Sequence, residues 1–295
     1  MKRLALFVAL LACSPGLATA DDMKPSPGPI GGSPDFGPPQ RVHYESPQHF
    51  AIEIKFTPYT PHIDRSKGLG GATPFSDLFE PQGTGQNKGK QPPYRLLTTV
   101  EFDYQFLRRA YGNFGLALTT GFYRRTTHSF VYGSDAMGNP VACTVPNCTR
   151  SGDRTGLNIV PLSALFVYRL DVLANRYHIP LIPYAKVGLG YYVWWINDGR
   201  GLTSTAKFPR PTAGSPSPIQ TSGYGGSFGF VLNPGIALQL DFIERAAART
   251  MDRELGINHT YLFVELAYAK INGFGANNKL DLSDTMLNAG IGFEF

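Results

Sequence analysis

Residues 114–122 read Phe-Gly-Leu-Ala-Leu-Thr-Thr-Gly-Phe, and two classes of residue alternate along this stretch. In a β-strand, successive side chains point to opposite faces. One face of this stretch would carry Phe114, Leu116, Leu118, Thr120 and Phe122. The other face would carry only small residues, namely Gly115, Ala117, Thr119 and Gly121. The stretch therefore predicts a strand with one broad apolar face and one face that needs little room.

The same alternation recurs in seven further segments. All eight segments are 50–56, 96–106, 114–122, 160–170, 181–195, 228–240, 262–268 and 287–295. An even number of long antiparallel strands is what a closed up-and-down sheet requires. We therefore expect an all-β fold, a closed antiparallel transmembrane barrel of about eight strands that covers residues 48–295.

Isolated charges stand among the small residues of the second faces. Those expected near mid-height are Glu53, Lys55, Glu101, Asp103, Lys186 and Glu265, and Arg169 and Glu294 also stand on these faces. Small residues with a few opposite charges suit a crowded interior, whereas the continuous apolar faces suit hydrocarbon. Because an unpaired charge in a dry interior costs several kcal/mol, we expect these charges to pair across the lumen and plug it.

Two other functions remain open at this point. The inward charges could line a narrow pore for ions or small solutes. The strands could also form a secreted, soluble lipocalin-like barrel that binds an apolar ligand.

Composition narrows the class of protein. Only 17% of the 295 residues are charged, below the roughly 25% of soluble domains. No apolar run after residue 12 approaches the roughly 18 to 20 residues of a membrane-spanning helix, which excludes a helical membrane protein. The sequence has no stripe of Lys and Arg with interleaved aromatic residues, which argues against a nucleic-acid partner.

The N-terminal segment has the features of an export signal. Lys2 and Arg3 precede the apolar run 4–12, and Ala18-Thr19-Ala20 forms a small-residue cleavage site, so residues 1–20 are expected to be removed. In a second interpretation, Leu10-Leu11-Ala12-Cys13 is a lipoprotein box and Cys13 is acylated. Residues 21–47 are rich in Pro and Gly and predict a flexible linker.

The remaining cysteines suggest a local link. Cys143 and Cys148 lie five residues apart, which suits a disulfide in an oxidising compartment. Two thiols without a second pair make a weak metal site, and the histidines are scattered without metal-ligand spacing. We expect neither a metal nor another cofactor.

The lengths of the connections alternate between short and long. With the N-terminus inside, the three longest connections, about 58–94, 125–156 and 197–222, all fall on the outside. Outer-membrane barrels have this asymmetry of short periplasmic turns and long external loops.

The last strand resembles the C-terminal signal of bacterial outer-membrane barrels. Residues 287–295 end in an aromatic residue and carry apolar residues at every second position: Leu287, Ala289, Ile291, Phe293 and Phe295. The chain is similar in pattern to small eight-stranded barrels of the OmpA and OmpW type, and residues 233–265 resemble myxobacterial-type outer-membrane barrel proteins. The resemblance implies a bacterial outer-membrane location, contact with outer-membrane lipid, and recognition of the last strand by the barrel assembly machinery. External loops that bind an unidentified ligand would then carry the function.

Two strand-end features complete the expected barrel. Trp194 and Trp195, together with other aromatic residues such as Tyr123 and Tyr192, would lie at the outer headgroup level. Asp241 can cap a short periplasmic helix over 242–255, with Gly256 just past its end. That helix would either lie on the membrane surface or cap the mouth of the barrel.

An enzyme is not expected. Some outer-membrane barrels modify lipids with Ser and His on one face of a strand. Here His128 and Ser129 are adjacent, so on a strand they would point to opposite faces. They are the only weak candidates for a lipid-modifying activity.

Overall fold

The computed structural model describes residues 49–71, 73–79, 92–109, 111–130, 133–134, 140–141, 150–177, 179–198, 205–208, 219–241, 243, 251 and 254–295. The expected signal segment 1–20, the linker 21–47, and the cysteines Cys13, Cys143 and Cys148 lie outside these residues. Most of the expected helix 242–255 also lies outside them. Gly256, which is described, has a φ of +69°, the left-handed conformation expected just past a helix.

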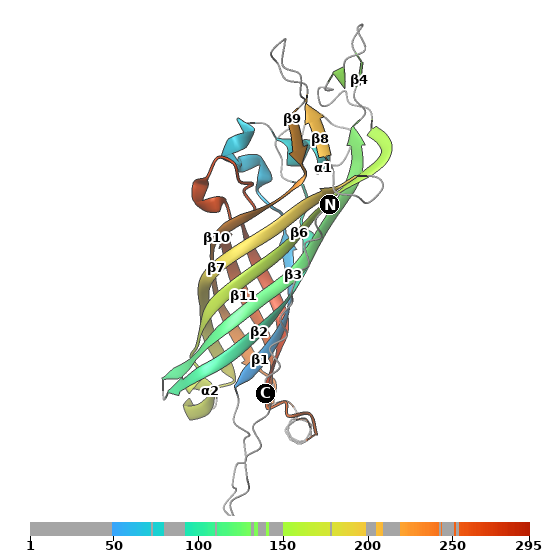
Figure 1. The fold of residues 1–295 in the computed structure, drawn as a ribbon. Helices are drawn as coiled ribbons and strands as arrows, with labels where there is room; N and C mark the ends of the chain where they lie inside the picture. The colour runs from blue at the N-terminus through green and yellow to red at the C-terminus, as the bar shows by residue number, and fades with distance from the viewer. Residues whose placement is uncertain are drawn as a thin grey trace, which may run out of the picture. The chain divides into compact units, whose positions relative to one another are not determined.

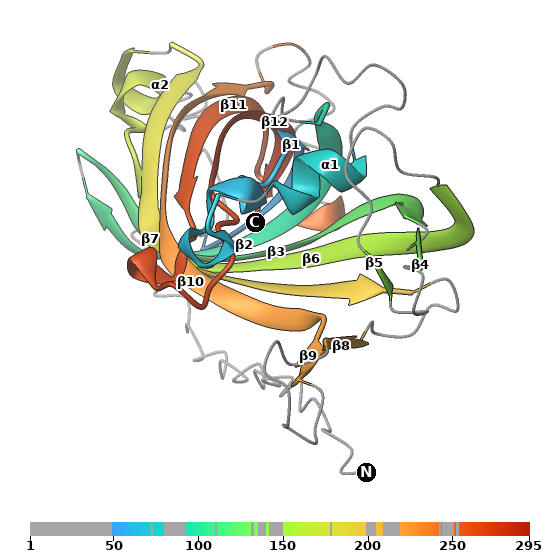
Figure 2. The same ribbon diagram turned by 90° about the horizontal axis from the view of Figure 1, so that it is seen from above.

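Within the described residues, eight long antiparallel strands close into one ring. They are β1 (Phe50–Tyr59), β2 (Arg95–Arg109), β3 (Gly112–Phe130), β6 (Arg150–Arg169), β7 (Leu181–Asn197), β10 (Tyr224–Gln239), β11 (His259–Lys270) and β12 (Asp284–Glu294). Each strand pairs with the next along the chain, and β12 pairs with β1. Figure 2, in which the barrel is seen from above, shows this closure. The expected all-β up-and-down barrel is confirmed.

The two ends of the barrel differ. The end where β1 begins and β12 finishes carries the connections β2–β3, β6–β7 and β10–β11, and we call it the turn end (Figure 1). The helix α2 (Val172–Tyr177) lies there. The opposite end, the loop end, carries the 3₁₀ turns η1 (Ile63–Arg65), η2 (Lys67–Leu69) and η3 (Gly273–Gly275), the helix α1 (Pro74–Phe79), and the small hairpins β4 (Gly133–Ser134) with β5 (Pro140–Val141) and β8 (Thr205–Phe208) with β9 (Ile219–Ser222). None of the helices among the described residues is long and apolar enough to span a membrane.

The hairpin of β3 and β6 extends further than the alternation predicts. Apolar periodicity marks only 114–122 and 160–170, whereas the two strands pair as far as Phe130 and Arg150. The next outward positions of β3 are the polar residues Arg124, Thr126 and His128, so the two faces of the strand no longer differ in polarity there. The periodicity therefore locates the apolar band of the strands and misses their polar extensions.

The seam between β1 and β12 closes at the turn end through backbone hydrogen bonds. The N–H of Phe295 donates to the carbonyl oxygen of Phe50 at 2.8 Å, and the N–H of His49 donates to the carbonyl oxygen of Phe295 at 2.9 Å. Pairing both strands leaves the sheet without a free edge, which is the main benefit of a closed barrel.

Inward glycines let neighbouring strands and side chains approach closely. Gly188 lies on the inner face of β7, and a Cβ built there would lie 2.0 Å from the carbonyl oxygen of Ala164 on β6. That oxygen belongs to the backbone, so only a shift of the strand could relieve the overlap. This is the physical reason for the small residues on the second face.

We predict that Gly188→Val destabilises the barrel by about 1–3 kcal/mol or more, because overpacking forces backbone movement. Urea unfolding followed by tryptophan fluorescence measures the effect. Gly152→Ala on β6 is the matched control, since nothing lies within 4 Å of a Cβ at that position. Equal unfolding midpoints for both variants would contradict the close approach of β6 and β7.

Candidate functional site

The centre of the lumen is occupied by charged side chains, which we call the ionic layer: Glu53, Lys55, Glu101, Asp103, Arg169, Lys186 and Glu265. Lys55, 2% exposed, donates from Nζ to Glu101 Oε2 at 2.7 Å and to Glu265 Oε1 at 3.1 Å. Its Nζ also lies 3.4 Å from Glu53 Oε2. One ammonium group thus joins carboxylates of β1, β2 and β11.

Lys186 repeats this arrangement from the opposite wall. Its Nζ lies 2.5 Å from Glu53 Oε2, donates to Glu101 Oε1, and lies 3.9 Å from Glu265 Oε2. The ring of Tyr184 lies 4.9 Å from the same nitrogen. Both lysines therefore share the same three carboxylates, and the six residues expected to meet in the lumen lie in one cluster with Arg169.

Arg169 extends the layer toward the turn end. Its guanidinium contacts Glu53 Oε1 at 2.7 Å and Asp103 Oδ2 at 2.8 Å. Asp103 Oδ1 has no hydrogen-bond partner among the described residues. The layer therefore holds three cations and four carboxylates.

Neutral side chains donate hydrogen bonds to these carboxylates. Thr119 on β3 donates to Glu101 Oε2 at 2.8 Å, and Asn288 on β12 donates to Glu265 Oε1 at 2.8 Å. Asn233 on β10 donates to Glu265 Oε1 at 3.3 Å. With these partners, every one of the eight strands contributes a side chain to one network. The sequence did not reveal the neutral partners, because an isolated Asn or Thr on an inner face gives no signal of its own.

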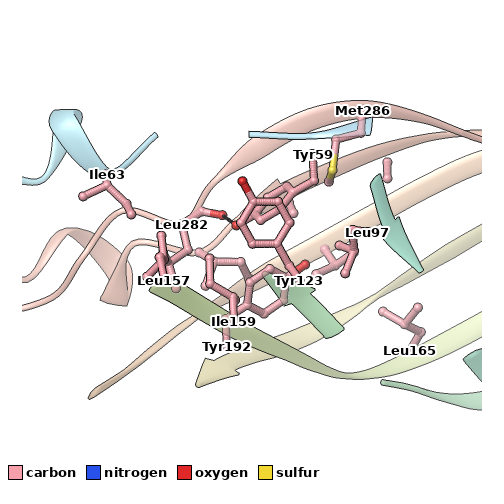
Figure 3. Close-up of a cluster of buried hydrophobic side chains, with 14 of the residues drawn as sticks. Tyr59, Ile63, Leu97, Tyr123, Leu157, Ile159, Leu165, Tyr192, Leu282 and Met286 are labelled. Atoms are coloured by element: carbon pink, nitrogen blue, oxygen red, sulfur yellow. Dashed lines mark hydrogen bonds between the residues drawn. The ribbon is translucent and has the colours of Figure 1, made fainter. Parts of the chain in front are cut away.

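The lumen toward the loop end is filled by apolar and aromatic side chains (Figure 3). The rings of Tyr59 and Tyr123 pack edge to face at 5.0 Å, and Tyr59 donates to the carbonyl oxygen of Leu282 at 2.8 Å. The cluster includes Ile159, Ile271 and Leu282, each fully buried. Phe75 and Phe79 of α1 belong to the same cluster.

Two of the aromatic residues expected at the lipid boundary belong to this inner cluster. Tyr123 and Tyr192 are buried in the lumen, and Trp194 packs against the cluster. Trp195 lies on the outer face, with its ring 6.2 Å from that of Phe122. Because neighbouring residues of a strand point to opposite faces, Trp194 and Trp195 lie on different sides of the wall, and their level in a membrane stays a prediction.

The lumen at the turn end contains a cavity of about 360 Å³, which we call the vestibule. Its walls include the apolar residues Ile182, Ala237 and Phe263, and Glu53 and Arg169 of the ionic layer line it. Near its mouth, Glu294 accepts hydrogen bonds from Gln105 at 2.7 Å and from Tyr261. The sequence did not predict this space, because a cavity depends on the length of opposed side chains and not on their polarity.

A polar pair lies at the rim of the vestibule. Asp241, just past the end of β10, accepts a hydrogen bond from Gln239 Nε2 at 2.7 Å and contacts Nδ1 of His259. Burial favours the neutral acid, but the hydrogen bonds from His259 and Gln239 hold the pKa of Asp241 below its ordinary value. Asp241 therefore carries its charge at neutral pH and fixes the start of β11 to the end of β10.

His128 and Ser129 do not form a catalytic pair. His128 Nδ1 lies 3.1 Å from the carbonyl oxygen of Ser151, and Ser129 donates to the carbonyl oxygen of Asp153 at 3.4 Å. The imidazole therefore does not hold the hydroxyl group of Ser129. The described ranges contain no group of His, Cys, Asp and Glu side chains arranged to hold a metal ion.

The expected assembly residues of β12 lie on its outward face. Leu287 is 60% exposed, and Ala289, Ile291 and Phe293 follow at every second position. Phe295 follows the strand and closes the seam with β1.

The sequence and the structure were compared with those of known proteins. Neither a family model nor a curated protein matches the sequence. Among solved structures, the chain is similar to the outer membrane protein OprG from Pseudomonas aeruginosa, with 12% identity, coverage of 84% of this chain and 96% of that chain, and a TM-score of 0.42. Neisserial surface protein A gives 11% identity, coverage of 83% and 97%, and a TM-score of 0.39. Ail, the attachment invasion locus protein of Yersinia pestis, gives 8% identity, coverage of 84% and 97%, and a TM-score of 0.38.

The ionic layer makes Lys186 a test of barrel stability. We predict that Lys186→Met costs about 3–5 kcal/mol, because it leaves buried carboxylates without their cation. A second change, Glu101→Gln, should restore part of the loss in the double variant by removing one of those charges. Urea unfolding of each variant measures both effects.

The matched control for Lys186 is Lys279→Met, because Lys279 is an exposed lysine of the connection between β11 and β12. We expect its unfolding free energy to stay at the wild-type value. A Lys186→Met protein as stable as this control would show that the ionic layer does not hold the barrel together.

Proposed function

We propose that this chain is an integral outer-membrane barrel with a plugged lumen, whose loop end carries its recognition role. The observation that carries the proposal is a belt of apolar side chains that face outward from all eight strands. One member from each strand, each at least 40% exposed, is Phe56, Val100, Leu118, Phe166, Leu189, Ile236, Val264 and Leu287. Soluble monomers rarely expose a contiguous apolar patch larger than a few hundred Å², so a continuous belt calls for a lipid solvent.

Aromatic contacts at both borders of the belt support this proposal. Toward the loop end, Phe122 and Trp195 lie 6.2 Å apart on the outer face. Toward the turn end, Phe114 and Tyr168 lie 4.8 Å apart. Aromatic residues favour the two headgroup levels of a membrane because their rings combine apolar area with a polar tip.

The inside of the barrel argues against the soluble lipocalin-like alternative. A carrier of apolar ligands needs an apolar, open lumen, whereas here seven charged residues cross the centre and an apolar cluster fills the loop end. A soluble protein would also have the opposite arrangement, with charges outside and apolar residues inside.

Export and assembly complete the proposal. A cleaved signal at residues 1–20 would take the chain out of the cytoplasm. The outward residues of β12 and Phe295 would be read by the barrel assembly machinery, and a Cys143–Cys148 disulfide would stabilise the connection after β3. No part of the proposal needs a cofactor or an enzymatic step, and the loop-end ligand would be a molecule outside the cell.

Placing one charged residue in the apolar belt tests whether the belt faces lipid. We predict that Leu118→Arg lowers stability in lipid vesicles by about 2–4 kcal/mol, since an arginine near the middle of the apolar band must leave water. The gel shift between folded and boiled protein, measured across a urea series, gives the midpoint.

His128→Arg is the control for the belt, because His128 lies on the same face of β3, beyond the apolar band. We expect its midpoint to be unchanged and the wild-type protein to fractionate with detergent-extracted outer membranes. A soluble periplasmic pool, or equal midpoints for both arginine variants, would contradict the membrane location.

A narrow pore is the second candidate, because the vestibule leaves space in the lumen at the turn end. The ionic layer and the inner cluster fill the lumen between the vestibule and the loop end, so we predict that the wild-type protein does not conduct ions in planar bilayers. Steady, resolvable conductance steps from purified protein would contradict the plug and favour the pore.

A further inference from the structure

The outer surface of the barrel carries a hollow at the loop end, just beyond the apolar belt. It has a volume of about 460 Å³ and is lined by residues of β2, β3, β6 and β7 and by the residue after β7. Those that matter here are Arg95, Arg124, Arg154, Gly156, Asn197 and Asp198.

Strand register places polar groups around a central glycine. One cross-strand row consists of Arg124, Asn158 and Trp195 on β3, β6 and β7. The next row toward the loop end consists of Thr126, Gly156 and Asn197. Arg154 follows two residues beyond Gly156 on the same face of β6. Gly156 lines the hollow between Arg124 and Arg154, and a Cβ at this position would lie 3.3 Å from Cγ2 of Thr126.

The hollow is electropositive. Arg95, Arg124 and Arg154 are exposed, and none of their side chains forms an ion pair with a carboxylate within the described part of the chain. Asp198 is the one carboxylate among the lining residues, so three positive charges and one negative charge leave a net charge of +2.

A buried donor lies in the row beside the hollow. Asn158 is 2% exposed, and its Nδ2 has no hydrogen-bond partner among the residues described. Asn158 does not itself line the hollow, so a ligand there would be held by the exposed guanidinium groups. Guanidinium groups match the oxygens of a phosphate in geometry as well as in charge.

The level of the hollow identifies the source of that phosphate. Phe122 ends the alternating segment 114–122 on the outer face of β3, Arg124 is the next residue on that face, and Trp195 borders the same row on β7. A cation one step beyond the aromatic boundary lies at the depth of lipid headgroups.

We propose that this hollow binds the phosphate monoester of an outer-leaflet lipid headgroup. The site holds Arg124 and Arg154 on either side of the phosphate, with Arg95 and Asn197 at its edge. This inference rests on the proposed membrane location and adds a specific lipid class to it.

The two tryptophans of the chain, Trp194 and Trp195, make the site directly observable. In a Trp194→Phe background, Trp195 is the single tryptophan, and it pairs across the strands with Asn158, which in turn pairs with Arg124. The experiment reconstitutes this protein in vesicles that contain either brominated phosphatidic acid, a phosphate monoester, or brominated phosphatidylcholine. Bromine quenches the fluorescence of a tryptophan that it contacts.

We expect phosphatidic acid to quench Trp195 at a lower mole fraction than phosphatidylcholine does. Arg124→Gln and Arg154→Gln should each lower this preference about fivefold. The double variant should therefore lower it roughly 25-fold. Arg109→Gln, an exposed arginine near the end of β2 at the turn end, controls for charge in general and should leave the preference unchanged.

The outcomes separate the site from the membrane location. Equal quenching by both lipids would overturn the site and leave the membrane location standing, whereas no quenching by phosphatidylcholine would overturn the membrane location itself. Inorganic phosphate added to the vesicles distinguishes the source, because a lipid-held phosphate keeps the preference. Loss of the preference with free phosphate would overturn a lipid ligand.

Discussion

The sharing of three carboxylates by two buried lysines is the interaction on which the rest of the barrel depends. Lys55 and Lys186 reach the same side chains, Glu53, Glu101 and Glu265, from opposite walls. A slip of one residue in any strand would turn its inner side chain toward the outside, because the period of side chains along a strand is two. A buried charge then loses its partner, which costs far more than a displaced apolar contact. The layer therefore selects one register for the whole ring.

The sequence predicted the strands where an apolar face contrasts with an opposite face of small residues and isolated charges, and it failed where that contrast ends. Leu116 and Leu118 mark β3 because Ala117 and Gly115 lie opposite, whereas Arg124 and Thr126 continue the same strand without any apolar signal. Charged members of the inner network were predictable, since a charge on a small-residue face must be paired. Tyr123 and Tyr192 were assigned to the wrong face because an aromatic residue at a strand end suits both an interface and a lumen, and only the packing partners decide between them. The vestibule and the hollow beside Gly156 depend on which side chains of neighbouring strands lie opposite one another, and the alternation of polar and apolar residues along one strand does not show this.

The lumen thus has three levels with different chemistry. An apolar cluster under α1 fills the loop end, the ionic layer crosses the middle, and the vestibule leaves the turn end open. In the ionic layer, Thr119, Asn233 and Asn288 donate hydrogen bonds to Glu101 and Glu265, whereas Glu53 and Asp103 contact cations. The outside has the reverse polarity, with outward apolar residues in the middle and arginines beyond their border. The interior and the exterior therefore differ in polarity both in the middle and at the loop end.

The seam between β1 and β12 has a consequence for the timing of folding. The two strands that close the ring are the furthest apart along the chain, with the N–H of His49 bonded to the carbonyl oxygen of Phe295. Contacts of such long sequence separation form slowly, because the loop entropy is lost before the contact stabilises anything. Until β12 arrives, β1 and β11 both present unpaired edges. Synthesis proceeds from the N-terminus, so the ring can close only after its last strand has been made.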